Sequence, residues 1–280
     1  SELNFGKFQI NEGQLMRVII KENYSDVADW TANYIVNAIK AKEKKTSKPF
    51  VLGLPTGSSP IPVYKKLIEM YNAGEISFKN VVTFNMDEYV GLPAEHEQSY
   101  IYFMRTNLFN HIDIPEENIN IPNGNAEDLE AECARYEEKI KQYGGIDLFL
   151  GGIGVDGHIA FNEPYTPISS RTGVRTLNYD TRIVNSRFFG NDPAAVPAKA
   201  LSVGVATITD AKTVMLIAGG HSKAQAIAAT VEGSLSHVWT ASALQLHSDA
   251  IIVCDEDACG NLKVDTYKYF LMLENKRFLI

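Results

Sequence analysis

Short apolar runs recur along the chain, and most are nearly continuous rather than alternating with polar residues. Runs of this kind, rich in β-branched residues, are typical of strands that are buried on both faces. We expect six strands, at residues 16–20, 50–54, 81–86, 146–150, 213–218 and 250–254.

Amphipathic helical patterns lie between these runs. Leu129, Cys133, Tyr136 and Ile140 recur at spacings of four and three residues, which places them on one helix face. Four helices are expected, at residues 26–42, 60–71, 127–143 and 222–231. The alternation predicts an α/β fold with an open, mainly parallel, doubly wound sheet that carries helices on both faces, similar to a Rossmann fold. Ligands bind beyond the carboxyl ends of strands in such sheets, so the loops after residues 54, 86, 150 and 218 should carry the chemistry.

The chain has 280 residues, a length that one α/β domain can reach. We expect residues 1–15 to be a tag or short extension and residues 16–280 to form a single domain. A hydrophobic share of 45% predicts a buried core. No apolar run approaches the ~20 residues that a membrane helix needs.

The net charge of -8 disfavours a general nucleic-acid or membrane-surface binder, because those partners need a positive field. A few local donors can still hold a small anionic substrate. The three cysteines, Cys133, Cys254 and Cys259, are too few and too scattered for a disulfide framework. A reducing, cytoplasmic location is the simpler interpretation.

A turn rich in hydroxyl groups follows the second expected strand. Thr56, Gly57, Ser58 and Ser59 precede Pro60, a residue suited to begin a helix. Free N–H groups at a helix start can cradle a phosphate. The alternative is a capped loop without a ligand.

Two adjacent carboxylates, Asp87 and Glu88, follow the third expected strand. One of them is a candidate base, since partial burial near a bound ligand raises a carboxyl pKa toward working pH. Neighbouring acids at a strand end are also often merely solvated.

The fourth expected strand leads into a loop that contains Gly152, Gly154 and Gly157 at the spacing of a dinucleotide fingerprint. Proline residues soon afterwards prevent the helix that such a site requires, so no dinucleotide is expected.

The same loop presents Asp156, His158 and Glu163. An imidazole flanked by two carboxylates is suited to proton transfer. Binding of a divalent metal by the three groups is the alternative.

Two cations farther along the chain, Arg187 and Lys223, are candidate phosphate ligands. Both residue types are more often found as surface charges.

Five segments together resemble the glucosamine-6-phosphate deaminase family: VLGLPTGSSP, VVTFNMDEYVGLP, GGIGVDGHIAFNEP, NSRFFG and VWTASALQLH. The resemblance extends over about residues 16–270. It implies that glucosamine 6-phosphate and water become fructose 6-phosphate and ammonium, with no metal and no organic cofactor.

The resemblance also implies roles for the matching residues. Asp87 matches the base that removes the C2 proton, and His158 matches the group that opens the sugar ring. Asp156 and Glu163 match the carboxylates that hold and tune that group. The phosphate would be bound by the turn formed by Thr56, Gly57, Ser58 and Ser59, together with Arg187 and Lys223.

By analogy with relatives of this length, the resemblance implies a homohexamer.

Two alternative functions share the expected fold. A 6-phosphogluconolactonase hydrolyses an ester, but NMDEYVGLP and FNEP resemble the deaminases. A sugar-phosphate sensor should lack the proton-moving residues and carry a DNA-reading helix pair.

Some members of the family have a second site for N-acetylglucosamine 6-phosphate, and here its pattern is altered. Thr166 and Pro167 replace a pair of serines, and Gly173 replaces an arginine. Arg175 keeps a second cation, and Tyr269 matches a further contact. We therefore expect only a remnant of an allosteric site.

Overall fold

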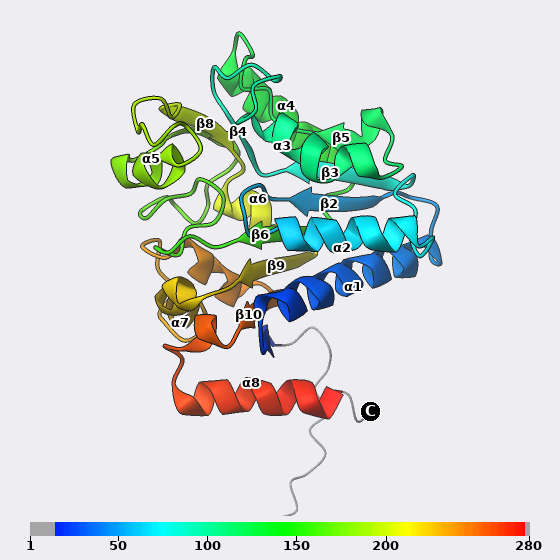
Figure 1. Cartoon of the computed structure of the whole chain (residues 1–280), viewed down its shortest axis with the longest axis vertical. Helices are drawn as coiled ribbons and strands as arrows, with labels where there is room; N and C mark the ends of the chain where they lie inside the picture. Colours follow the sequence, from blue (N-terminus) through cyan, green and yellow to red (C-terminus); the bar gives the residue numbers. More distant parts are fainter. Residues whose placement is uncertain (1–14, 278–280) are drawn as a thin grey trace, which may run out of the picture.

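A seven-stranded parallel sheet forms the centre of the molecule, in the order β1-β10-β9-β6-β2-β3-β5 (Figure 1). The computed structural model describes residues 15–277, so the extension expected at residues 1–15 lies outside the described residues except for Leu15. The strands are β1 (Arg17–Lys21), β2 (Phe50–Leu54), β3 (Val81–Asn85), β5 (Ile119–Asn120), β6 (Leu148–Gly152), β9 (Thr213–Ala218) and β10 (Ala250–Asp255). All six predicted strands are confirmed within two residues at each end, and β5 was not predicted.

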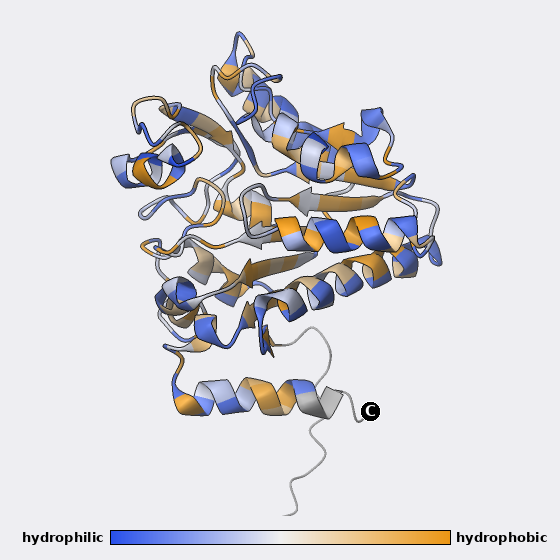
Figure 2. Ribbon diagram, in the orientation of Figure 1, coloured by the Kyte–Doolittle hydropathy of each residue, from blue (hydrophilic) through white to orange (hydrophobic). Residues whose placement is uncertain are grey.

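Helices cover both faces of this sheet, which confirms the doubly wound fold. On one face lie α1 (Tyr24–Glu43), α2 (Ile61–Asn72) and α3 (Tyr100–Asn107), packed on side chains such as Leu52 and Ile217. On the other lie α4 (Leu129–Gln142), α6 (Val205–Thr209) and α7 (Ala224–Val231), packed on side chains such as Val51 and Leu216. Figure 2 shows apolar strands between helices whose outer sides are hydrophilic.

The helix ends follow local capping rules. Asn23 precedes α1 and accepts a hydrogen bond from the Asp26 N–H at 3.0 Å, which satisfies one of the free donors of the first turn. The helix buries Val27, Ile35 and Ile39, whose spacing places them on its inner side. The last helix, α8 (Val264–Arg277), packs against β1. Within residues 15–277, every helix is too short or too polar to span a bilayer.

A small antiparallel sheet, absent from the sequence-based expectation, stands beside the main one in the order β4-β8-β7. Its strands are β4 (Asp87–Tyr89), β7 (Gly173–Thr176) and β8 (Lys199–Ser202), and α5 (Tyr179–Ser186) connects two of them. Met86 joins the two sheets, because its N–H donates to Leu54 of β2 and its carbonyl accepts from Val203 after β8. The chain therefore passes directly from β3 into β4, with Asp87 at the junction.

Candidate active site

Loops from the carboxyl ends of β2, β3, β6 and β9 converge on one pocket of about 410 Å³. This is where the fold predicts a ligand. Of the residues selected from the sequence, those that line it are Thr56, Gly57, Ser58, Ser59, Asp87, Asp156, His158, Arg187 and Lys223.

We call the turn of residues 56–59, between β2 and α2, the anion cradle, because its free backbone donors suit an anion. The backbone N–H groups of Thr56, Gly57, Ser58 and Ser59 donate to no acceptor in the described part of the chain. The side-chain hydroxyls of the turn have no hydrogen-bond partner there either. Unpaired N–H groups that precede a helix N-terminus favour an anion such as a phosphate monoester.

The adjacent carboxylates Asp87 and Glu88 face different surroundings. Asp87 lines the pocket although only 7% of it is exposed. Burial, with the charge of Glu88 as a second cause, raises its pKa to about 8. Glu88 does not line the pocket. Its carboxylate accepts hydrogen bonds from the N–H groups of Tyr89, Tyr100 and Ile101, at 2.8, 2.9 and 3.0 Å. Asp87 is therefore the carboxyl group of this pair that can act as a base in the pocket.

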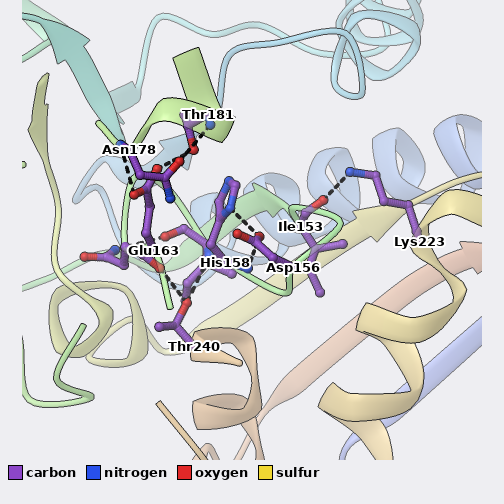
Figure 3. Close-up of polar contacts among 10 residues, drawn as sticks. Ile153, Asp156, His158, Glu163, Asn178, Thr181, Lys223 and Thr240 are labelled. Atoms are coloured by element: carbon purple, nitrogen blue, oxygen red, sulfur yellow. Dashed lines mark hydrogen bonds and ion pairs between the residues drawn. The ribbon is translucent and has the colours of Figure 1, made fainter. Parts of the chain in front are cut away.

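His158 and Asp156 form a bonded pair in the loop after β6 (Figure 3). Partial burial opposes ionisation of Asp156, but the bond from His158 and its charge outweigh it and keep the carboxyl pKa below its usual value. An ionised carboxylate only accepts, so Nδ1 of His158 donates to Oδ1 of Asp156 at 2.6 Å. Nε2 of His158 has no partner among the described residues and is open to a ligand.

Close backbone packing holds this pair. A Cβ on Gly154 would lie 2.4 Å from the His158 ring and 2.7 Å from Asp156, so only glycine fits beneath them. On the other side, the Thr240 hydroxyl accepts from the Ile159 N–H at 3.3 Å and donates to the Asn162 carbonyl at 2.8 Å (Figure 3). No helix starts in this loop, as the proline residues there predicted.

Glu163, the second carboxylate expected beside the imidazole, does not bond to His158 in this structure. Its carboxylate accepts hydrogen bonds from the Asn178 N–H and the Thr181 hydroxyl, at the start of α5, and not from His158 (Figure 3). The positive end of the α5 dipole favours a carboxylate at this position. Across residues 15–277, no three His, Cys, Asp or Glu side chains gather closely enough to hold a metal ion.

Lys223 and Arg187 bring positive charge to the pocket from separate elements. Lys223 donates from Nζ to the Ile153 carbonyl at 2.6 Å (Figure 3). Burial lowers its pKa, the charge of Arg187 lowers it further, and Asp156 opposes the shift. Arg187 follows α5 and lies over the Phe188 ring, 4.6 Å from its centroid.

The residues of the expected allosteric remnant lie on separate segments of the fold. Arg175 lies on β7 and donates to the Arg171 carbonyl at 2.7 Å. The Thr166 N–H donates to the Glu163 carbonyl at 3.0 Å. Tyr269 lies on α8, which packs against β1. In Figure 1, α8 is at the bottom, whereas β4 and β8 of the small sheet are near the top.

Sequence reasoning missed an aromatic wall of the pocket. Tyr89, Tyr100, Phe161 and Phe189 line it together, and the Tyr89 and Tyr100 rings lie 4.8 Å apart. Such a wall excludes water from the carboxyl group of Asp87. Three of the four, Tyr89, Phe161 and Phe189, lie within the recognised segments. Aromatic residues in such a fold are usually core residues, so the sequence carried little signal for a pocket wall.

Comparisons with known proteins agree with this geometry. Residues 22–253 match the family described as "Glucosamine-6-phosphate isomerases/6-phosphogluconolactonase". The chain belongs to this family. Glucosamine-6-phosphate deaminases of Yersinia pseudotuberculosis and Yersinia pestis are each 60% identical to it over 259 residues, which cover 92% of this chain and 97% of theirs. The resemblance seen in the sequence is thereby confirmed.

Solved structures of family members share the fold. A monomeric glucosamine-6-phosphate deaminase matches with a TM-score of 0.84 and 42% identity, over 88% of this chain and 100% of that one. A 6-phosphogluconolactonase from Thermotoga maritima matches with a TM-score of 0.68 at 17% identity, over 86% of this chain and 100% of that one. At that identity the second likeness shows the fold alone.

Proposed function

We propose that this chain converts glucosamine 6-phosphate and water to fructose 6-phosphate and ammonium. The observation that carries the proposal is the buried carboxyl group of Asp87, which shares one pocket with an anion cradle and with the His158–Asp156 pair. The 60% identity to curated glucosamine-6-phosphate deaminases supports it over the lactonase reaction of the same family.

In the proposed reaction, the turn of residues 56–59, Arg187 and Lys223 bind the phosphate and fix the sugar. His158, through its open Nε2, moves the proton that opens the ring. Asp87 then takes the C2 proton, which gives an enolamine, and returns a proton to C1. The C2 imine so formed adds water and releases ammonium, which balances the overall reaction.

Asp156 and Glu163 are the proposed carboxylates that orient and tune His158. The bond at 2.6 Å supports this role for Asp156. A direct contribution of Glu163 requires its bonds to Asn178 and Thr181 to be exchanged for one to His158.

The test is to mix the purified protein with glucosamine 6-phosphate and to measure ammonium and fructose 6-phosphate. Equal amounts of both products support the proposal. Hydrolysis of 6-phosphogluconolactone without ammonium release from the amino sugar would contradict it and favour the lactonase alternative.

We further propose a cytoplasmic homohexamer. The three cysteines are all free and buried, which fits a reducing compartment. The assembly rests on resemblance to relatives of similar length, and a shorter relative is described as monomeric. Light scattering decides it, because six chains of 31.0 kDa support the hexamer and a single chain contradicts it.

A further inference from the structure

We propose that Tyr24 is a positioning residue that ties together the two loops of the phosphate site. Its hydroxyl bonds to the turn after β2, and its ring packs on the loop after β9. The inference rests on the proposed function, in which these two loops bind the substrate phosphate. Tyr24 is the first residue of α1 and belongs to none of the sequence segments that carry the family resemblance.

The hydroxyl fixes one end of the anion cradle. Tyr24 donates from its hydroxyl to the Ser59 carbonyl at 2.7 Å. This bond turns the carbonyl oxygen toward α1, whereas a carbonyl directed into the pocket would repel a phosphate. Burial raises the pKa of Tyr24 to about 12, although the bond to Ser59 opposes the shift, so the hydroxyl remains a donor at working pH. At the other end of the turn, the Tyr64 hydroxyl donates to the Pro55 carbonyl.

The ring fixes the second loop. A Cβ on Gly219 would lie 2.3 Å from Cδ2 and 2.8 Å from Cε2 of Tyr24, so the ring rests directly on the backbone there. The Gly220 N–H donates to both carboxylate oxygens of Asp255 at 3.0 Å, which holds the loop from the other side. Lys223 follows three residues later and reaches the pocket. One side chain thus sets the distance between the N–H groups of the cradle and the ammonium group of Lys223.

The decisive variant is Tyr24→Phe, which keeps the ring on Gly219 and removes only the hydroxyl donor. We expect the Kd for inorganic phosphate and the KM for glucosamine 6-phosphate to rise together by about threefold to tenfold, the effect of one lost hydrogen bond. The kcat should stay within about twofold, because the bond acts on binding and not on the reacting atoms.

A second variant tests the contact between the Tyr24 ring and Gly219. Gly219→Ala forces the Tyr24 ring to move, so it should raise the same two constants. Tyr267→Phe is the matched control, because its hydroxyl donates to Glu256 at 2.8 Å and neither residue lines the pocket. This control should leave the phosphate Kd unchanged.

Unchanged phosphate affinity in both Tyr24→Phe and Gly219→Ala would overturn the inference, as would a fall in kcat at constant Kd. These outcomes are distinct from failure of the proposed function. In that case the wild-type protein itself would release no ammonium from glucosamine 6-phosphate or bind no inorganic phosphate.

Discussion

Asp87 combines burial with access to the pocket, and burial and the charge of Glu88 raise its pKa to about 8. A base with a pKa near working pH is suited to remove a C2 proton. Replacement by Asn keeps the shape but cannot accept the proton. We expect Asp87→Asn to lower C2 proton exchange with solvent by about 10²–10⁴-fold or more while substrate affinity is nearly retained.

Exchange is measured by the loss of deuterium from C2-labelled glucosamine 6-phosphate. Asp180→Asn is the matched control, since Asp180 also lines the pocket but has no role in the proposed reaction. Rapid exchange in Asp87→Asn would show that another group removes the proton.

The same carboxyl group makes stability depend on pH. Its pKa lies near 3.8 in the unfolded chain and at about 8 in the folded protein, so the folded state retains a proton that the unfolded state has lost. This contribution to stability is fully present below about pH 4, falls as pH rises, and is lost above about pH 8. Between these two pH values, Asp87→Asn should therefore gain stability relative to wild type, by at most about 1.4 kcal/mol per pH unit. Denaturant unfolding of both proteins at pH 5 and pH 8 checks the sign, and a constant difference contradicts the shift.

At the scale of single residues, the local pattern located the pocket, and the family resemblance supplied the roles. The pattern marked Asp87 and Glu88 equally, the resemblance chose Asp87, and the fold adds that Glu88 bonds to the start of α3. It also grouped Glu163 with His158, although Glu163 bonds to residues beyond β7. These distinctions depend on contacts between residues 12 to 18 positions apart, beyond the reach of helix or strand periodicity.

Among the elements, α3 depends on a residue outside it. Glu88 of β4 accepts from the N–H groups of Tyr100 and Ile101, two of the free donors at the start of α3, and is 5% exposed. Glu88→Gln removes the charge and one acceptor oxygen. We expect it to lower the free energy of unfolding by about 1–3 kcal/mol.

The same substitution should also act on the reaction. Without the Glu88 charge the pKa of Asp87 falls, so the acidic limb of the profile of kcat/KM against pH moves to lower pH. Glu95→Gln, in the exposed loop between β4 and α3, is the control and should change neither stability nor the profile. An unmoved acidic limb in Glu88→Gln would mean that burial alone sets the pKa of Asp87.

Elements of the main sheet were predictable, whereas the small sheet was not. Strands such as β9 are continuous apolar runs, and their burial on both faces gives a strong local signal. In contrast, β4 has three residues, and its pairing of Asp87 with Ser202 joins distant parts of the chain. The half-buried Glu137 carboxylate of α4 likewise accepts hydrogen bonds from Thr172 and Thr207, a link that sequence periodicity does not reveal.

At the scale of the whole molecule, the remnant of the second site is divided between distant parts. Arg175 lies in the small sheet, and Tyr269 lies on α8 beside β1 (Figure 1). An effector that touches both would have to lie between subunits of the proposed hexamer. Arg171, a cation two residues before Gly173 that could replace a lost charge, is already paired with Asp210.

We therefore expect hyperbolic kinetics with little response to N-acetylglucosamine 6-phosphate. Pro167 offers no N–H donor, and Gly173 carries no charge. A Cβ at Gly173 would lie 2.7 Å from Nη1 of Arg175, which is the far end of a flexible side chain and can shift. Two lost charge-assisted bonds of ~1.5–3 kcal/mol each weaken effector binding by at least about a hundredfold. Initial rates against glucosamine 6-phosphate, with and without the acetylated sugar, test this. A sigmoidal curve that becomes hyperbolic on adding the effector would show a working second site.

The double variant Pro167→Ser, Gly173→Arg restores both groups and should bind the acetylated sugar more tightly than wild type, because the added guanidinium can pair with its phosphate.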